Sequence, residues 1–247
     1  MDTSLSGHNA LAQDVDVPVI ALDVPIMYED EGQDELGETD FHFDALSIFR
    51  FGVAAHLAGT DYRVFSDLNL YYHPIDTEAY VSPDDMVVKP ARDLGEEVTS
   101  YRVERDGPPP ELTAEVLSKR SAQQQDTTNK PEIYSFMGVA EFVLIDVTGK
   151  FLPQRLLLKR LEKDGSWTDL QDADGGVTSR LGFRLRIDGD GRLRIVNSRS
   201  GEAYPRPDEA ERERLARQDA EAKLAEAQDE LKALRAELQR LRKEPRH

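Results

Sequence analysis

Two acidic residues stand where the surrounding sequence is apolar. Asp84 follows Pro83 at the entry to the apolar residues 86–88, and Glu115 lies within the strand-like residues 112–118. A carboxylate inside an apolar strand destabilises the fold unless it is paired or binds a metal. Lys130 follows downstream, at the start of an expected helix. Two such carboxylates can hold Mg²⁺, which activates a water, and a lysine can stabilise charge on a phosphoryl group.

Each of these residues also has a simpler interpretation. Asp84 could be a turn or cap residue, since Pro-Asp is common in turns, and Asp85 beside it leaves the choice of metal ligand open. Glu115 could pair with a buried arginine. Lys130 could be a solvated residue at a helix start, although the helix dipole disfavours a cation there.

The elements that would position these residues form an α/β pattern. Apolar residues recur at helical spacing over residues 43–57 and predict a first helix, which Gly59 ends. A second helix is predicted over residues 131–137, ended by Gly138. Strands are predicted over residues 62–66, 69–72, 79–81, 86–88, 112–118 and 141–146, a strand or pair of strands over 151–161, and a hairpin from 183–187 and 193–196. The mostly apolar residues 141–146 indicate burial on both faces.

The end of the chain has a different pattern. After Pro207 there is no glycine and one further proline, and leucine recurs every seven residues at Leu224, Leu231 and Leu238. Leu234 and Leu241 supply the second position of the heptad. This pattern predicts a coiled coil in which two copies of the chain associate, parallel or antiparallel. A solvated single helix is the alternative, because two or three strong heptads are marginal alone.

The order and spacing of several segments resemble the Uma family of restriction endonucleases, in the PD-(D/E)XK nuclease superfamily. The resemblance covers roughly residues 25–245. It is carried by residues 69–72 (Asn-Leu-Tyr-Tyr), 83–84 (Pro-Asp), 115–118 (Glu-Val-Leu-Ser), Asp126 with Lys130, 134–146, and 201–202 (Gly-Glu). It implies a restriction-endonuclease-like α/β core with a central mixed sheet flanked by helices, followed here by the C-terminal coiled-coil helix. It also implies Mg²⁺-dependent (or Mn²⁺-dependent) phosphodiester hydrolysis.

The resemblance also implies roles for individual residues. Asp84 and Glu115 would be metal ligands, with the backbone carbonyl of Val116 as a third. The superfamily places a lysine two positions after the glutamate, where this chain has Leu117. The lysine would come instead from the following helix, which assigns the role to Lys130. Lys119 competes with it, and Glu38 could supply a further acid.

Composition limits the remaining possibilities. The formal net charge of −17 argues against a nucleic-acid partner, but residues 1–49 alone contain twelve acids and no Lys or Arg. The charge therefore does not describe the surface that would meet a ligand. The chain has no cysteine, which excludes disulfides, thiolate zinc sites and a cysteine nucleophile. No apolar run approaches the length of a membrane span, no signal peptide is recognisable, and we expect a cytoplasmic protein.

We therefore expect three regions: an acidic, largely disordered segment (residues 1–24), a restriction-endonuclease-like domain (25–204) and the coiled-coil helix (205–247). The first functional hypothesis is a Mg²⁺-dependent DNA endonuclease that forms a homodimer through its C-terminal helix. Its rival is an inactive nuclease-fold scaffold that dimerises through the same helix. In a third possibility, the acidic segment covers a basic site as an internal mimic of DNA.

Overall fold

The computed structural model describes residues 40–73, 78–95, 97–118 and 129–243. The chain divides into two units, residues 1–35 and 36–247, and every described residue belongs to the second. The expected N-terminal segment lies outside the described residues, as do Glu38, Lys119 and Asp126.

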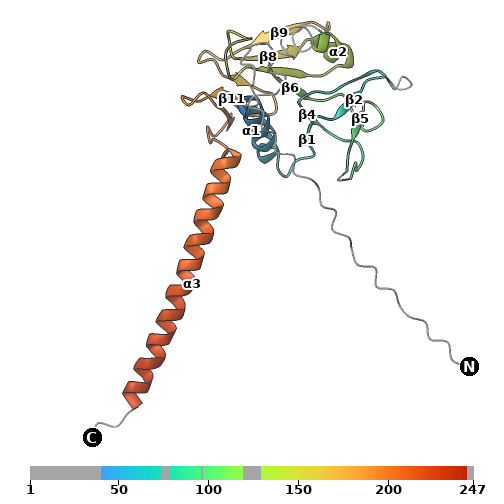
Figure 1. Cartoon of the computed structure of the whole chain (residues 1–247). Coiled ribbons are helices and arrows are strands. Elements are labelled where there is room, and N and C mark those ends of the chain that lie inside the picture. Colours follow the sequence, from blue (N-terminus) through green and yellow to red (C-terminus); the bar gives the residue numbers. More distant parts are fainter. Residues whose placement is uncertain (1–39, 74–77, 96, 119–128, 244–247) are drawn as a thin grey trace, which may run out of the picture. The chain divides into compact units, whose positions relative to one another are not determined.

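The described residues form three helices and twelve strands (Figure 1). The helices are α1 (Asp40–His56), α2 (Lys130–Met137) and α3 (Pro207–Lys243). The first six strands are β1 (Arg63–Ser66), β2 (Asn69–Tyr71), β3 (Tyr80–Val81), β4 (Asp85–Val88), β5 (Ser100–Arg102) and β6 (Leu112–Val116). The others are β7 (Glu141–Ile145), β8 (Leu156–Leu161), β9 (Trp167–Leu170), β10 (Val177–Thr178), β11 (Phe183–Ile187) and β12 (Leu193–Asn197).

The central sheet has six strands in the order β1-β4-β6-β7-β8-β9. β6 and β7 run parallel, and the other neighbours are antiparallel. Parallel neighbours need a crossover connection, and α2 lies in the connection between β6 and β7. The prediction of an α/β core with a central mixed sheet and flanking helices is confirmed. Two three-stranded sheets accompany it, in the orders β10-β11-β12 and β3-β2-β5.

Side chains of the central strands alternate between two hydrophobic clusters, one on each face of the sheet. The first cluster contains Val87, Ala114 and Val116 and includes residues of α1 and β10–β12. The second contains Met86 and Val88 of β4 and includes residues of α2, β2, β3 and β5. Figure 1 shows α1 and α2 on opposite sides of the sheet. All five residues of β7 are buried, as the apolar run predicted.

One predicted strand region is shorter than expected. Residues 151–161 contain a single strand, β8, which begins at Leu156. The reason is Asp146, whose carboxylate accepts hydrogen bonds from the backbone amides of residues 148, 149, 151 and 152. These bonds hold the residues between Asp146 and the start of β8 in a turn. β5 and β10, of three and two residues, were not predicted at all.

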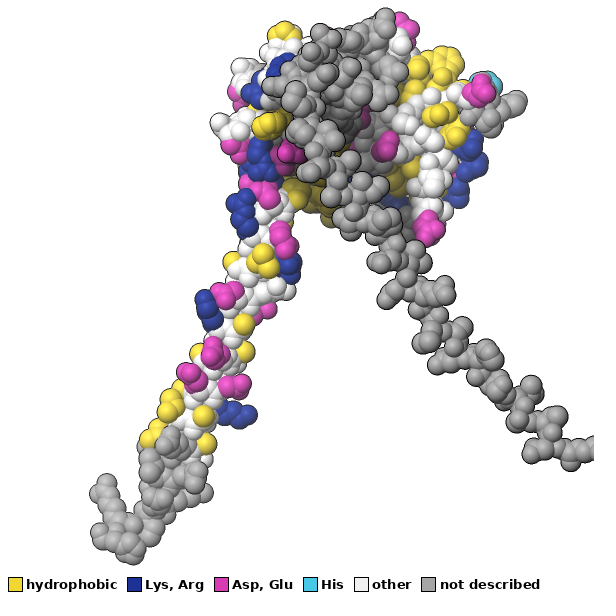
Figure 2. Space-filling model, in the orientation of Figure 1, with side chains coloured by type: hydrophobic (Ala, Val, Ile, Leu, Met, Phe, Trp, Pro, Cys, Tyr) yellow, Lys and Arg dark blue, Asp and Glu magenta, His cyan; other side chains and the backbone are white. Residues whose placement is uncertain are grey.

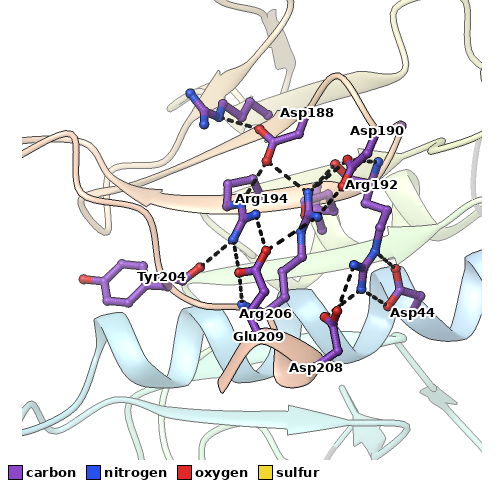
Figure 3. Close-up of polar contacts among 12 residues, drawn as sticks. Asp44, Asp188, Asp190, Arg192, Arg194, Tyr204, Arg206, Asp208 and Glu209 are labelled. Atoms are coloured by element: carbon purple, nitrogen blue, oxygen red, sulfur yellow. Dashed lines mark hydrogen bonds and ion pairs between the residues drawn. The ribbon is translucent and has the colours of Figure 1, made fainter. Parts of the chain in front are cut away.

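The first turn of α3 is tied to the domain by ion pairs (Figure 3). The Arg192 guanidinium binds Asp44 of α1 at 2.7 Å and Asp208 of α3 at 3.0 Å. Arg194 binds Glu209 at 2.6 Å, and the buried Arg206 binds the aspartates of the β11–β12 turn. Beyond this turn the side chains of α3 are exposed as far as Ala236. The predicted seam includes four exposed leucines, Leu224, Leu231, Leu234 and Leu238.

In the described part of the chain, no helix is both long and apolar enough to cross a bilayer.

Candidate active site

Neighbouring strands bring Asp84 and Glu115 together. β4 and β6 are antiparallel with Asp85 opposite Ala114, so one further step along each strand places Asp84 opposite Glu115. The backbone amide of Val116 donates a hydrogen bond of 2.7 Å to Oδ2 of Asp84, which links the two chain segments. Because side chains alternate, Asp84 shares the face of Met86, and Glu115 points away from the cluster that holds Ala114. Both carboxylates therefore lie on the α2 face of the sheet.

Asp85 points to the opposite face. Its Oδ1 accepts a hydrogen bond from the Ser66 hydroxyl, which itself accepts one of 2.9 Å from Arg50 of α1. Oδ2 of Asp85 is buried and has no hydrogen-bond partner among the described residues. Burial, opposed by the Ser66 hydrogen bond and assisted by the charge of Asp84, raises the pKa of Asp85 to about 8. Of the adjacent aspartates, Asp84 alone lies beside Glu115.

Glu115 is fully buried and receives a donor at each carboxylate oxygen. Lys130 Nζ lies 2.6 Å from Oε2, and the Tyr134 hydroxyl donates to Oε1 at 2.6 Å. Lys130 also donates to the Ser82 carbonyl at 3.3 Å, two residues before Asp84. Among the described residues, a lysine and a tyrosine thus contact the Glu115 carboxylate. Three predicted residues, Asp84, Glu115 and Lys130, meet at one place.

The position of Lys130 follows from local structure. Leu117, where the superfamily has lysine, is buried in the hydrophobic cluster on the α2 face. Lys130 and Tyr134 are four residues apart on α2, so they share a helix face and reach the same carboxylate. Pro131 opens the helix, and Gly138 ends it with a left-handed backbone at φ 85°. The dipole penalty of a cation at the start of α2 is offset by Glu115.

Two contributors were not anticipated from the sequence. Tyr134 could have been found by its spacing of four residues from Lys130 on the expected helix. The Ser82 carbonyl had no such signal, because its role depends on how α2 packs against the chain before β4.

The donor chemistry at this place fits a hard cation. Mg²⁺ prefers oxygen ligands, keeps several waters and needs one or two carboxylates. Among the described residues no three His, Asp or Glu side chains are placed to hold a metal ion together, and the candidate site offers two carboxylates, Asp84 and Glu115. Each carboxylate oxygen has two lone pairs, so it can accept a hydrogen bond and also ligate a cation. Val116, the expected carbonyl ligand, ends β6 next to Asp84.

Other buried acids have structural partners. Glu141 binds Arg160, the Ser179 hydroxyl and the Arg180 amide, and so ties β7 to β8 and to the chain that follows β10. Asp106 binds Arg92 and Arg105 and accepts from a backbone amide. Glu115 differs from both because a second acid, Asp84, lies opposite it on the neighbouring chain segment, and because Lys130 also contacts that segment at Ser82.

Comparisons with known proteins place the chain in one family. A family model named Uma2, described as "Putative restriction endonuclease", matches residues 37–188, which include Asp84, Glu115 and Lys130. No curated protein matches the chain. A solved structure, titled as a putative nuclease belonging to DUF820 from Anabaena variabilis, is 18% identical with a TM-score of 0.43. That match covers 57% of this chain and 73% of the other. The family model spans more than half of the sequence, and the chain therefore belongs to the Uma2 family.

Proposed function

We propose that this protein is a Mg²⁺-dependent endonuclease that hydrolyses DNA phosphodiester bonds. The observation that carries the proposal is the pairing of Lys130 with the fully buried Glu115 beside Asp84, within the segment that matches the nuclease family. Ion pairs inside proteins are often purely structural. Here the lysine contacts both acid-bearing segments, as a site for a phosphate group and its cation requires.

Each residue has a defined task in this proposal. The carboxylates of Asp84 and Glu115, with the Val116 carbonyl, would hold Mg²⁺, which lowers the pKa of a bound water and neutralises phosphate charge. Lys130 stabilises the negative charge that develops on the phosphoryl oxygens. The Tyr134 hydroxyl and the Val116 amide fix the orientations of Glu115 and Asp84.

Nicking of supercoiled plasmid in Mg²⁺ or Mn²⁺ tests this function. The near-isosteric changes Asp84→Asn and Glu115→Gln should each lower the rate by at least about a hundredfold, because each removes a charged metal ligand. Asp85→Asn is the matched control, since it alters a neighbouring acid that faces α1. Wild-type rates in both Asp84→Asn and Glu115→Gln would refute the assignment.

The rival is a scaffold that keeps the fold without the chemistry. Residues 50–205 contain 25 acids and 20 Lys or Arg, which favours the scaffold because a surface that binds DNA is usually basic. The exposed leucines of α3 suit both functions, since an open seam can bind a second copy. Calorimetric titration with Mn²⁺ separates the two functions: no binding favours the scaffold, and binding lost in Asp84→Asn favours the nuclease. Homodimerisation through α3 is part of both proposals, and a monomeric mass at micromolar concentration would contradict it.

A further inference from the structure

The small sheet β3-β2-β5 carries a row of aromatic and cationic side chains. Tyr71 of β2 pairs with Tyr80 of β3 on one side and with Arg102 of β5 on the other. The two rings are 5.3 Å apart between centroids and inclined by 40°. The Arg102 guanidinium carbon lies 4.1 Å from the Tyr71 ring centre. We call Tyr71, Tyr80 and Arg102 the tyrosine–arginine row.

This row lies on the outer face of its sheet. The alternate residues Val81, Leu70 and Tyr101 form the inner face and are buried in the cluster shared with α2. Tyr80, in contrast, exposes 46% of its surface. Figure 2 shows hydrophobic and Lys or Arg side chains close together on the side of the domain where β2 and β5 lie in Figure 1. The Arg102 guanidinium lies against the Tyr71 ring, and within the described chain it forms no ion pair with a carboxylate.

The row is continuous with the candidate active site. The Ser82 hydroxyl donates to Oδ1 of Asn69 at 2.8 Å, and these two residues lie two positions along their strands from Tyr80 and Tyr71. The carbonyl of the same Ser82 accepts a hydrogen bond from Lys130. Tyr80 precedes Asp84 by four residues, at most about 13 Å of extended chain. Stacked nucleotides rise about 3.4 Å each, so a base on Tyr80 would lie within about four nucleotides of the cut.

We propose that the tyrosine–arginine row binds unpaired bases of the nucleic acid that the active site cleaves. Exposed aromatic rings on a sheet stack on bases that are free of a duplex, and this stacking tolerates any sequence. An arginine next to the ring adds stacking and a charge for the adjoining phosphate. In a duplex the bases already stack on one another, so the row selects single-stranded or locally opened substrate. This inference rests on the proposed endonuclease function, because that function identifies nucleic acid as the substrate.

A structural role is the competing explanation. Cross-strand aromatic pairs stabilise small sheets, and a three-stranded sheet with strands this short benefits from one. Such a pair would change stability when removed, but it would not make binding depend on the presence of bases.

The experiment measures the base dependence of binding with the full chain in EDTA, where no cleavage occurs. The probes are fluorescein-labelled octathymidylate, an abasic oligomer of the same length, and the same thymidine strand in a duplex. Fluorescence anisotropy should show octathymidylate bound at least about tenfold more tightly than either of the others. Tyr80→Ala and Tyr80→Leu should abolish that preference, and Tyr80→Phe should keep it because the ring remains. Phe51→Ala, which removes an exposed aromatic residue on α1, is the control and should leave the preference unchanged.

Several results would overturn the inference. One is equal affinity for octathymidylate and the abasic oligomer. Another is a base preference that survives Tyr80→Leu. If the urea midpoint is unchanged, Tyr80 has no role in base binding, and if the midpoint is lower, its role is structural. Base-dependent binding without any plasmid cleavage would refute the endonuclease proposal alone. Plasmid cleavage without base-dependent binding would refute the stacking site alone.

Discussion

Replacing Lys130 by methionine should destabilise the domain strongly in the absence of metal. The change keeps most of the side-chain volume and removes the ammonium that lies 2.6 Å from the Glu115 carboxylate. Glu115 is fully buried, so its carboxylate would lose the Lys130 ammonium while having no exposed surface of its own. Tyr134 would still donate to it, but a neutral hydroxyl does not balance a charge.

The magnitude follows from the geometry. At 2.6 Å and an effective dielectric constant of about 20, the two charges attract by about 6 kcal/mol, most of which desolvation offsets. Removal of one partner from a buried pair typically costs about 3–5 kcal/mol. The Lys130 side chain is 15% exposed, so some solvent reaches this position and we expect about 3 kcal/mol. With a urea m-value of about 2 kcal/mol/M, the unfolding midpoint should fall by about 1.5 M.

A double-mutant cycle in EDTA isolates the interaction. Glu115→Gln should lower the free energy of unfolding less than Lys130→Met does. The Lys130 ammonium that remains still donates to the Ser82 carbonyl and is partly exposed to solvent. The double variant should be more stable than Lys130→Met alone, since it leaves no buried charge. Addition of Mg²⁺ should stabilise Lys130→Met more than the wild type, because a cation at the acids replaces the lost ammonium and meets no repulsion from it.

Two results would refute this reasoning. If Lys130→Met lowered the free energy of unfolding by less than about 1 kcal/mol and the cycle were additive, Glu115 would not be a carboxylate balanced by Lys130. If Mg²⁺ stabilised neither protein, the two acids would not form a cation site, and the scaffold function would gain support.

Four further predictions concern other parts of the chain. The pKa of Asp85 is raised to about 8 in the folded protein, so the stability that protonated Asp85 contributes is complete below pH 4 and is lost as pH rises through 8. Asp85→Asn should flatten this decline when the free energy of unfolding is measured by urea titration at several pH values. The same decline in the variant and the wild type would contradict the prediction. Arg206→Met should lower the free energy of unfolding by about 2 kcal/mol, because it removes the buried cation that binds Asp190 and one of the three arginines that bind Asp188, and an unchanged urea midpoint would contradict it. Leu231→Asp with Leu238→Asp should give a monomer by sedimentation with unchanged domain stability, whereas a persistent dimer would place the interface elsewhere. Deletion of residues 1–35 should increase DNA affinity by anisotropy if the acidic segment acts as a mimic, and equal affinity would exclude that possibility.

Local sequence signals predicted most elements of the central sheet and both short helices. The helical spacing of apolar residues found α1, and the Gly138 signal found the end of α2. The hairpin of β11 and β12 followed from Gly189-Asp190-Gly191. These features depend on neighbours in sequence, so one sequence suffices for them. β5 and β10 exist because of strands they pair with, β2 and β11, and a short segment stabilised by a distant partner has no periodicity to detect.

The candidate site shows the same division. Asp84, Glu115 and Lys130 were predicted as a group, and the structure brings them together. The choice between Asp84 and Asp85 remained open from the sequence, although strand alternation contained the answer: Asp84 is in phase with Met86, and Asp85 is in phase with Val87. That phase could be used only once the structure showed which cluster contains α2.

In the proposed active site, the position of the lysine depends on a distant edge of the sheet. A lysine at position 117 would be fixed by its own strand, whereas Lys130 is fixed by the placement of α2. The indole of Trp167 on β9 donates to the carbonyl of Pro131 at 3.0 Å, and Ser135 donates to the Gly165 carbonyl at 2.6 Å. The turn between β8 and β9 thus holds both ends of the helix that carries Lys130. Because a charge acts on a transition state only at close range, the proposed role of Lys130 depends on the hydrogen bonds between this outer hairpin and α2.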